Sequence, residues 1–289
     1  MIESASLDAL LPPEMAEKAE QIGIKKAGMA AVPMLLLAVL AGAFIALGAG
    51  FMTTALAGAA GIVPFGIGRV LGGVVFSLGL ILVVVGGAEL FTGNNLIVMA
   101  WASGRVTSAQ VLRNWAVVYA GNFLGAAGLA LLVFLAQQHE FGNGAVGRTV
   151  LTIAEAKLKL GFGQAVALGV LCNVLVCLAV WLSFSARSTT DRILAVVPPV
   201  AAFVAAGFEH SIANMYLVPL ALLIKAGAAP RFWDAIGQTS DDYPTLTISG
   251  FLIDNLLPVT LGNIIGGAVL VGSVYWCIYL RGRRPSANG

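Results

Sequence analysis

Residues 70–102 read VLGGVVFSLGLILVVVGGAELFTGNNLIVMAWA, and a single charged residue, Glu89, interrupts this apolar run. A second run, residues 193–224, reads ILAVVPPVAAFVAAGFEHSIANMYLVPLALLI and is apolar apart from Glu209 and His210. A continuous helix of either length would extend about 50 Å, but a hydrocarbon core is only about 30 Å thick. Two helices per run would each be too short. Each run therefore predicts one membrane span with a non-helical break, which must be covered by protein or line a cavity.

The predicted breaks hold the polar residues of both runs. The first break covers residues 89–95, ELFTGNN, and the second covers residues 207–211, GFEHS. Polar side chains are rare within membrane spans and commonly mark the path of a substrate or ion. The coincidence of break and polar residues is the strongest indication of function in the sequence.

Simpler apolar runs complete the predicted fold. They cover residues 30–56, 114–138, 160–186 and 255–280, each close to the length of a membrane-spanning helix. Only 10% of the 289 residues are charged, too few to cover a water-facing surface. We therefore expect an all-α polytopic membrane protein with six transmembrane helices, of which the second and fifth are broken.

The two halves of the chain repeat the same order of elements. Each has a simple span, a broken span with a glutamate, and a simple span with the motif G-N-x-x-G, which contains Asn122 in one half and Asn263 in the other. Helix packing alone is an alternative explanation for these closely spaced glycines. Three spans per half require the second half to be inverted. We predict two inverted three-helix repeats, at about residues 30–138 and 160–281.

The flanking segments are predicted to be cytoplasmic. Residues 1–29 form an N-terminal segment in which an amphipathic helix starts at Pro12-Pro13, although a solvated leader is the alternative. Residues 30–281 form the transmembrane domain and residues 282–289 a tail. Of the 16 Lys and Arg residues, this orientation places ten inside, which favours cytoplasmic termini. Those ten are Lys18, Lys25, Lys26, Arg105, Arg113, Arg187, Arg192, Arg281, Arg283 and Arg284.

His210 is the clearest candidate for chemistry, because histidine changes its charge near neutral pH and here lies within a membrane span. The alternative is a neutral histidine that hydrogen-bonds a loop carbonyl and holds the break in shape. Thr92, in the other break, could donate to a passing anion or cap the next half-helix. Glu89 and Glu209 are expected to support the breaks by accepting hydrogen bonds from freed backbone N–H groups.

The sequence predicts no cofactor and no metal site. Cys172, Cys177 and Cys277 lie in apolar runs, where cysteine commonly serves as a small packing residue. The sequence has no zinc-ligand spacing, no phosphate-binding P-loop and no G-x-S-x-G nucleophile motif. An enzyme and a nucleic-acid-binding protein are therefore not expected.

Long motifs in this chain resemble the formate/nitrite transporter family. They are FSLGLIL at 76–82, ELFT at 89–92, GFEHSIANM at 207–215 and LPVTLGNIIGG at 257–267. The likeness extends from LLPP at 10–13 to YLR at 279–281. The segments LLPPEMA and FEHSI are similar to the formate-channel branch. One departure is the Thr-Gly-Asn-Asn segment at residues 92–95, where formate channels often have Thr-Ser-Thr.

The resemblance implies a homopentamer in the bacterial inner (plasma) membrane, with an aquaporin-like fold and one pore per protomer. It implies that Thr92 and His210 face each other in the pore, that Asn173 lies near His210, and that Lys157 draws anions toward a vestibule. It also implies two apolar constrictions. The outer one comprises Phe76, Leu80 and Phe203, and the inner one Leu90, Phe91 and Val176. From composition alone, such apolar residues are more commonly core or lipid-facing.

We therefore predict a channel for formate and related small monovalent anions, with nitrite, acetate and hydrosulfide as further substrates. The pore histidine is expected to couple permeation to protonation, so protons and membrane lipid are predicted partners and nucleic acid is not. The alternatives are a nitrite or hydrosulfide channel of the same family and a neutral-solute, water-type channel, whose flux would be insensitive to anion charge and to pH. An intramembrane enzyme would show substrate turnover, and a non-conducting receptor or scaffold would bind without flux.

Overall fold

The computed structural model describes residues 8–282, and within this range the chain forms helices and no strand. Six of these helices are long and apolar enough to cross a membrane, which confirms the predicted all-α, six-span architecture. They are α2 (Ala31–Leu56), α3 (Phe65–Gly86), α6 (Ser108–Leu135), α8 (Phe162–Ser185), α9 (Thr189–Ala206) and the last span, Gly250–Tyr279. The last span comprises the π-helical stretch Gly250–Leu256, α12 (Leu257–Ile264), the π-helical stretch Ile265–Ser273 and α13 (Val274–Tyr279).

Shorter helices connect and complete these spans. They are α1 (Pro12–Ala27), α4 (Phe91–Asn94), α5 (Val98–Ala102), α7 (Ala145–Leu158), α10 (Ser211–Gly227) and α11 (Pro230–Ile236), with 3₁₀ turns at Asn95–Ile97, Gln138–Glu140 and Ser240–Asp242. The amphipathic helix expected near the N-terminus is α1. Sequence analysis gave no helix at α7 or α11. The predicted tail lies outside the described residues, apart from Gly282.

The chain leaves the helical conformation in the middle of both long apolar runs, as predicted. Residues 87–90 separate α3 from α4, and residues 207–210 separate α9 from α10. Each break begins with a left-handed glycine, Gly87 with φ of 81° and Gly207 with φ of 78°, a conformation that ends helices and that other residues rarely adopt. The first break is shorter than predicted, because the chain returns to helix directly at Phe91.

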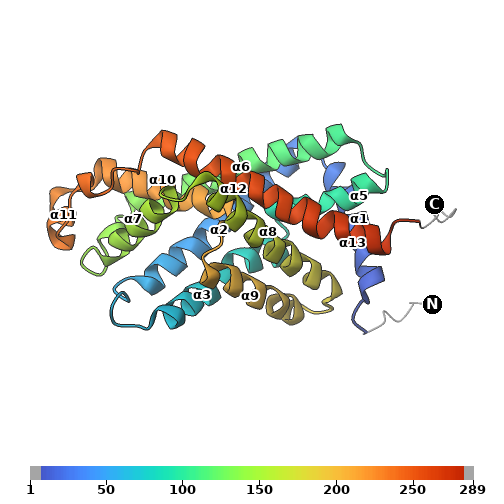
Figure 1. The fold of residues 1–289 in the computed structure, drawn as a ribbon, viewed down its shortest axis with the longest axis horizontal. Coiled ribbons are helices and arrows are strands. Elements are labelled where there is room, and N and C mark those ends of the chain that lie inside the picture. Colours follow the sequence, from blue (N-terminus) through green and yellow to red (C-terminus); the bar gives the residue numbers. More distant parts are fainter. Residues whose placement is uncertain (1–7, 283–289) are drawn as a thin grey trace.

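The broken helices pack against each other, and the G-N-x-x-G helices pack against simple spans. Helix α3 lies beside α9, α2 beside α6, and α8 beside α12 (Figure 1). At Gly125 an added Cβ would lie 1.9 Å from the Val39 carbonyl oxygen, and at Gly262 it would lie 2.2 Å from that of Val166. Helix packing is therefore one reason for the glycines of both motifs.

The two short helices that precede the α2 and α8 spans lie at opposite ends of the molecule. Figure 1 places α1 at the end where α13 terminates, and α7 at the far end beside α11. Helix α7 packs on α10, and α1 packs on α5. This arrangement supports the predicted inverted repeat, which stays a prediction.

Replacing Gly125 by alanine should force α2 and α6 apart, because the new methyl group would overlap a backbone carbonyl of α2. We expect the thermal unfolding midpoint in detergent to fall by about 5 °C or more. Gly128→Ala is the matched control, because Gly128 lies in the same helix with no atom within 4 Å of an added Cβ. Equal midpoints for the two variants would contradict the close-approach argument.

Candidate functional site

Two cavities enter the protein toward the breaks. The α1-side cavity, of about 290 Å³, lies between α1 and the first break and is lined by Lys26, Glu89 and Leu90, among others. The α7-side cavity, of about 250 Å³, lies beside the second break and reaches His210. Since α1 and α7 lie at opposite ends of the molecule, the cavities approach the centre from opposite directions.

Thr92 and His210 meet at the centre of the protein. His210 Nε2 lies 3.0 Å from Thr92 Oγ1, and both residues are buried. On the other side of the ring, Nδ1 accepts a hydrogen bond of 3.1 Å from the Ala213 backbone N–H, so His210 caps the N-terminus of α10. The neutral ring with its proton on Nε2 satisfies both contacts. Thr92 provides no cap for α4; its hydroxyl contacts His210 instead.

Asn122 and Asn263 bind the backbone of the breaks. Asn122 Oδ1 accepts from the Phe91 backbone N–H at 2.9 Å, and its Nδ2 donates to the carbonyls of Glu89 and Ala38. Asn263 makes the same set of contacts in the other half. Its Oδ1 accepts from Ser211 N at 3.0 Å, and its Nδ2 donates to the carbonyls of Glu209 and Gly169. Leaving such buried groups unpaired would cost about 1–3 kcal/mol each.

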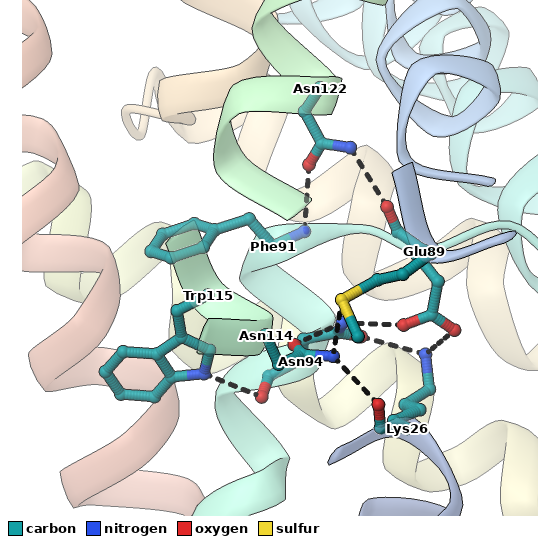
Figure 2. A network of polar contacts seen from close by, with 8 residues as sticks. Lys26, Glu89, Phe91, Asn94, Asn114, Trp115 and Asn122 are labelled. Carbon is teal, nitrogen blue, oxygen red and sulfur yellow. Dashed lines mark hydrogen bonds and ion pairs between the residues drawn. The ribbon is translucent and has the colours of Figure 1, made fainter. Parts of the chain in front are cut away.

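A cluster of charged and amide side chains holds the first break against α1 and α6 (Figure 2). Lys26 Nζ lies 2.7 Å from Glu89 Oε1 and 2.8 Å from Asn94 Oδ1. Asn94 Nδ2 donates to Glu89 Oε2 and to Asn114 Oδ1. Asn114 Nδ2 returns to the Lys26 carbonyl at 3.1 Å, which closes the network.

The second break is held by an equivalent cluster. Lys157 Nζ lies 2.7 Å from Glu209 Oε1, Asn214 Nδ2 donates to Glu209 Oε2 and to Asn255 Oδ1, and Asn255 Nδ2 donates to the Lys157 carbonyl. Lys157 thus takes the place in this half that Lys26 takes in the other. Both lysines lie in a short helix that precedes a simple span, α1 before α2 and α7 before α8. The predicted repeat bounds, about residues 30–138 and 160–281, stay a prediction.

The glutamates support the breaks in a different way from the one expected. Their carboxylates bind lysine and asparagine side chains. The backbone N–H groups of Phe91 and Ser211 bind Asn122 and Asn263, and those of Glu89 and Glu209 bind the carbonyls of Leu37 and Leu168. Sequence reasoning missed the two asparagines that bind these glutamates, Asn94 and Asn214. A signal existed, because both breaks read Glu followed by Asn at the same interval, residues 89 and 94 and residues 209 and 214.

The residues that sequence analysis missed at the clusters are therefore Lys26, Asn94, Asn114, Asn214 and Asn255. Asn114 also precedes Asn122 by the same interval that separates Asn255 from Asn263. This second repeated spacing could have identified both asparagines. Lys26 carries no such signal, because its distance along the chain from Glu89 differs from that between Lys157 and Glu209.

The apolar residues predicted to form the outer and inner constrictions do not line the two cavities in the predicted groups. Phe76 and Phe203 line the α7-side cavity and pack edge to face, with ring centroids 5.8 Å apart. Phe203 also stacks on His210, at 5.9 Å. Leu80 was expected beside these two rings, but it lines the α1-side cavity with Leu90. The reason is that Leu80 lies one helical turn, about 6 Å, further along α3.

Phe91 and Val176 do not line either of these two cavities. Phe91 packs against Tyr119, with ring centroids 4.9 Å apart, and against Trp115, and Val176 is buried in the core. Phe91 therefore lies beside α6, away from Leu90, although the two residues are adjacent in sequence. Side chains of consecutive residues point in different directions where a helix starts.

Asn173 links the segment after the first break to the last span. Its Nδ2 lies 2.6 Å from the Asn263 carbonyl, 3.0 Å from Asn95 Oδ1 and 3.3 Å from the Thr92 carbonyl. Asn173 thus fixes the backbone that carries Thr92, and no hydrogen bond joins it to His210 among the described residues. The expected proximity to the His210–Thr92 pair arises through Thr92.

The Lys157–Glu209 ion pair should stabilise the second break only while both partners are present. The Glu209 side chain is 4% exposed and that of Lys157 16% exposed, so removing one charge leaves the other poorly solvated. We expect Lys157→Met and Glu209→Gln each to lower the thermal midpoint by about 5 °C or more. The double variant should recover part of that loss. Additive effects of the two substitutions would contradict this coupling.

Comparisons with known proteins agree with this geometry. The sequence profile of the family described as formate/nitrite transporter matches residues 13–277. The formate channel FocA of Escherichia coli K12 is 49% identical over 95% of this chain and 96% of its own length. The formate channel FocA of Haemophilus influenzae is 41% identical over 91% of this chain and 93% of its own.

A solved structure described as a pentameric formate channel with formate bound superposes with a TM-score of 0.83 at 47% identity, covering 87% of this chain and 98% of that one. A second, an FNT family ion channel, has a TM-score of 0.77 at 28% identity and covers 92% of this chain. These relatives are channels and not enzymes. The chain belongs to the formate/nitrite transporter family of multi-pass membrane proteins.

Proposed function

We propose that this protein is a channel for formate and related small monovalent anions, with one pore through each protomer. The observation that carries the proposal is the meeting of Thr92 and His210 between two cavities that approach from opposite ends. The N-terminus of α10 lies at the same point, and the partial positive charge of a helix N-terminus favours an anion. The similarity to formate channels supports formate as the substrate.

The assembly is a homopentamer in the bacterial inner membrane, with both termini in the cytoplasm. The pentameric relative supports the assembly. Apolar side chains on the outer faces of the spans, such as Leu36, Leu132 and Ile253, are exposed in the single chain and suit lipid or a neighbouring protomer. The excess of Lys and Arg in the predicted inner segments supports the orientation. In this orientation the α1-side cavity opens to the cytoplasm and the α7-side cavity opens to the outside.

His210 acts first as a neutral hydrogen-bond donor. Because Nδ1 accepts from the Ala213 N–H, the proton of the neutral ring lies on Nε2 and points to Thr92 Oγ1. The Thr92 hydroxyl proton is then free to donate to an anion oxygen. A small carboxylate at this point would replace part of its hydration shell with these donors, as selective pores do.

Charging His210 requires a local rearrangement. A proton on Nδ1 would face the Ala213 N–H, so the imidazolium cannot form until this cap of α10 opens. An anion beside the ring favours the charged form. Nδ1 takes up a proton from solvent water that enters by the cavity reaching His210, and the proton on Nε2 then passes to the anion. The ring is left neutral with its proton on Nδ1, and it regains the resting tautomer by losing that proton to water and taking one up on Nε2. Permeation and protonation are coupled in this way, and the neutral acid then crosses the apolar ring pair Phe76 and Phe203.

His210→Asn tests this role, because asparagine keeps a hydrogen-bonding side chain but cannot change its charge. We expect formate uptake into proteoliposomes to fall at least tenfold and to lose its dependence on pH between 5.5 and 7.5. His139→Asn is the matched control, since His139 is the only other histidine and lies between α6 and α7. Wild-type uptake by His210→Asn at both pH values would assign this histidine a purely structural role.

Leu80→Ala and Phe203→Ala test the apolar constrictions. If these side chains narrow the pore, their truncation should widen it and raise acetate uptake relative to formate uptake by several-fold. Leu171→Ala is a suitable control, because Leu171 lies on an adjacent span with its side chain exposed on the outer face. The measurement is a competition between labelled formate and acetate, and an unchanged ratio in both variants would remove these residues from the pore.

A further inference from the structure

Arg69 lies at the mouth of the α7-side cavity and binds the end of the neighbouring broken helix. From the first turns of α3, its Nε donates to the Ala205 carbonyl at 3.1 Å, and its Nη2 donates to the Val204 carbonyl. These carbonyls belong to the last turn of α9, directly before the break. The guanidinium also packs on Gly207, where an added Cβ would lie 3.1 Å from Nη2.

The charged residues that line the α7-side cavity do not contribute equally to its electrostatic potential. Arg69, Lys157 and Glu209 are its charged lining residues. Lys157 and Glu209 form an ion pair at 2.7 Å, so their fields largely cancel a short distance away. Among residues 8–282, no carboxylate forms an ion pair with Arg69. The net positive charge of the cavity therefore belongs to Arg69.

Arg69 also opposes a field that would repel an anion. The C-terminal end of a helix carries a partial negative charge of roughly half an elementary charge. Helix α9 ends at the cavity, so its last carbonyls would present this charge to an entering anion. The two hydrogen bonds from Arg69 occupy those carbonyls with a cationic donor.

We propose that Arg69, rather than Lys157, sets the positive potential of the α7-side cavity and so selects for anions at this mouth. Arg69 is a specificity-determining residue that acts through its field, and Lys157 fixes the second break through Glu209. The assignment deepens the proposed function, because an anion channel needs a positive mouth. The assignment predicts that Arg69→Lys, which conserves the charge, preserves the positive potential of the cavity. Arg69→Gln, which removes the charge, should abolish it.

The test measures the potential directly, without depending on formate flux. Ala156 lines the same cavity and is exposed, so Ala156→Cys provides a reporter thiol. Cys172 and Cys177 are buried, and the exposed Cys277 is removed by Cys277→Ala. The rates of thiol modification by an anionic sulfonatoethyl and a cationic trimethylammonioethyl methanethiosulfonate are compared in wild-type, Arg69→Lys, Arg69→Gln and Arg148→Gln backgrounds.

At low ionic strength, Arg69→Gln should lower the anionic-to-cationic rate ratio by about fourfold, as Coulomb's law gives for one charge at ~10 Å in water. The effect should shrink at 0.5 M salt. Arg69→Lys should stay near wild type. Arg148→Gln, which removes an exposed arginine of α7 outside this cavity's lining, should have little effect.

The assignment would be overturned if Arg69→Gln left the anionic-to-cationic modification ratio unchanged. It would also be overturned if Arg69→Lys and Arg69→Gln lowered this ratio equally. Formate uptake by the same variants separates this failure from that of the proposed function. If formate uptake by every variant stays at the level of empty liposomes while the modification ratio follows the charge at position 69, formate conduction is refuted. The role of Arg69 then remains supported.

Discussion

The structure depends on satisfying the backbone of two helices that are interrupted inside the membrane. In hydrocarbon no water is available, so each freed N–H or C=O group must find a protein partner. Asn122 and Asn263 supply side-chain partners, each with one accepted and two donated hydrogen bonds to a break and the helix beside it, while carbonyls of Leu37 and Leu168 accept from Glu89 and Glu209. Without them the breaks would be too costly to keep, and no site for Thr92 and His210 would exist.

The position of these asparagines explains the glycines around them. Asn122 reaches the Ala38 carbonyl of α2, and Asn263 reaches the Gly169 carbonyl of α8, so each asparagine needs its helix to lie very close to a neighbour. The glycines of G-N-x-x-G permit that approach, because side chains at Gly125 and Gly262 would overlap facing carbonyls. Close packing and support of the break are therefore two effects of one motif, and neither explanation of the motif excludes the other.

The sequence was sufficient for the spans, the two breaks and the pairing of Thr92 with His210, since length, charge and family motifs identify them. It was insufficient for contacts made by packing distant segments. Lys26 reaches Glu89 only because α1 folds back onto the first break, and no periodicity records that. Leu80 lines the α1-side cavity because it lies one helical turn beyond Phe76, and Phe91 faces α6 because the helix resumes at that residue. A sequence pattern does not fix helix positions to within one or two residues.

In the proposed anion pathway, the two ion pairs account for the presence of two buried glutamates. A free carboxylate would repel the permeating anion, but Glu89 and Glu209 are each neutralised by a lysine at 2.7 Å. A lysine that is used in this way contributes little field of its own to the cavity. The attraction of anions must then come from charges outside the pairs and from helix N-termini. In our proposal, the ion pairs support the breaks and a different residue attracts the anion, although Arg69 also binds the end of α9 beside the second break.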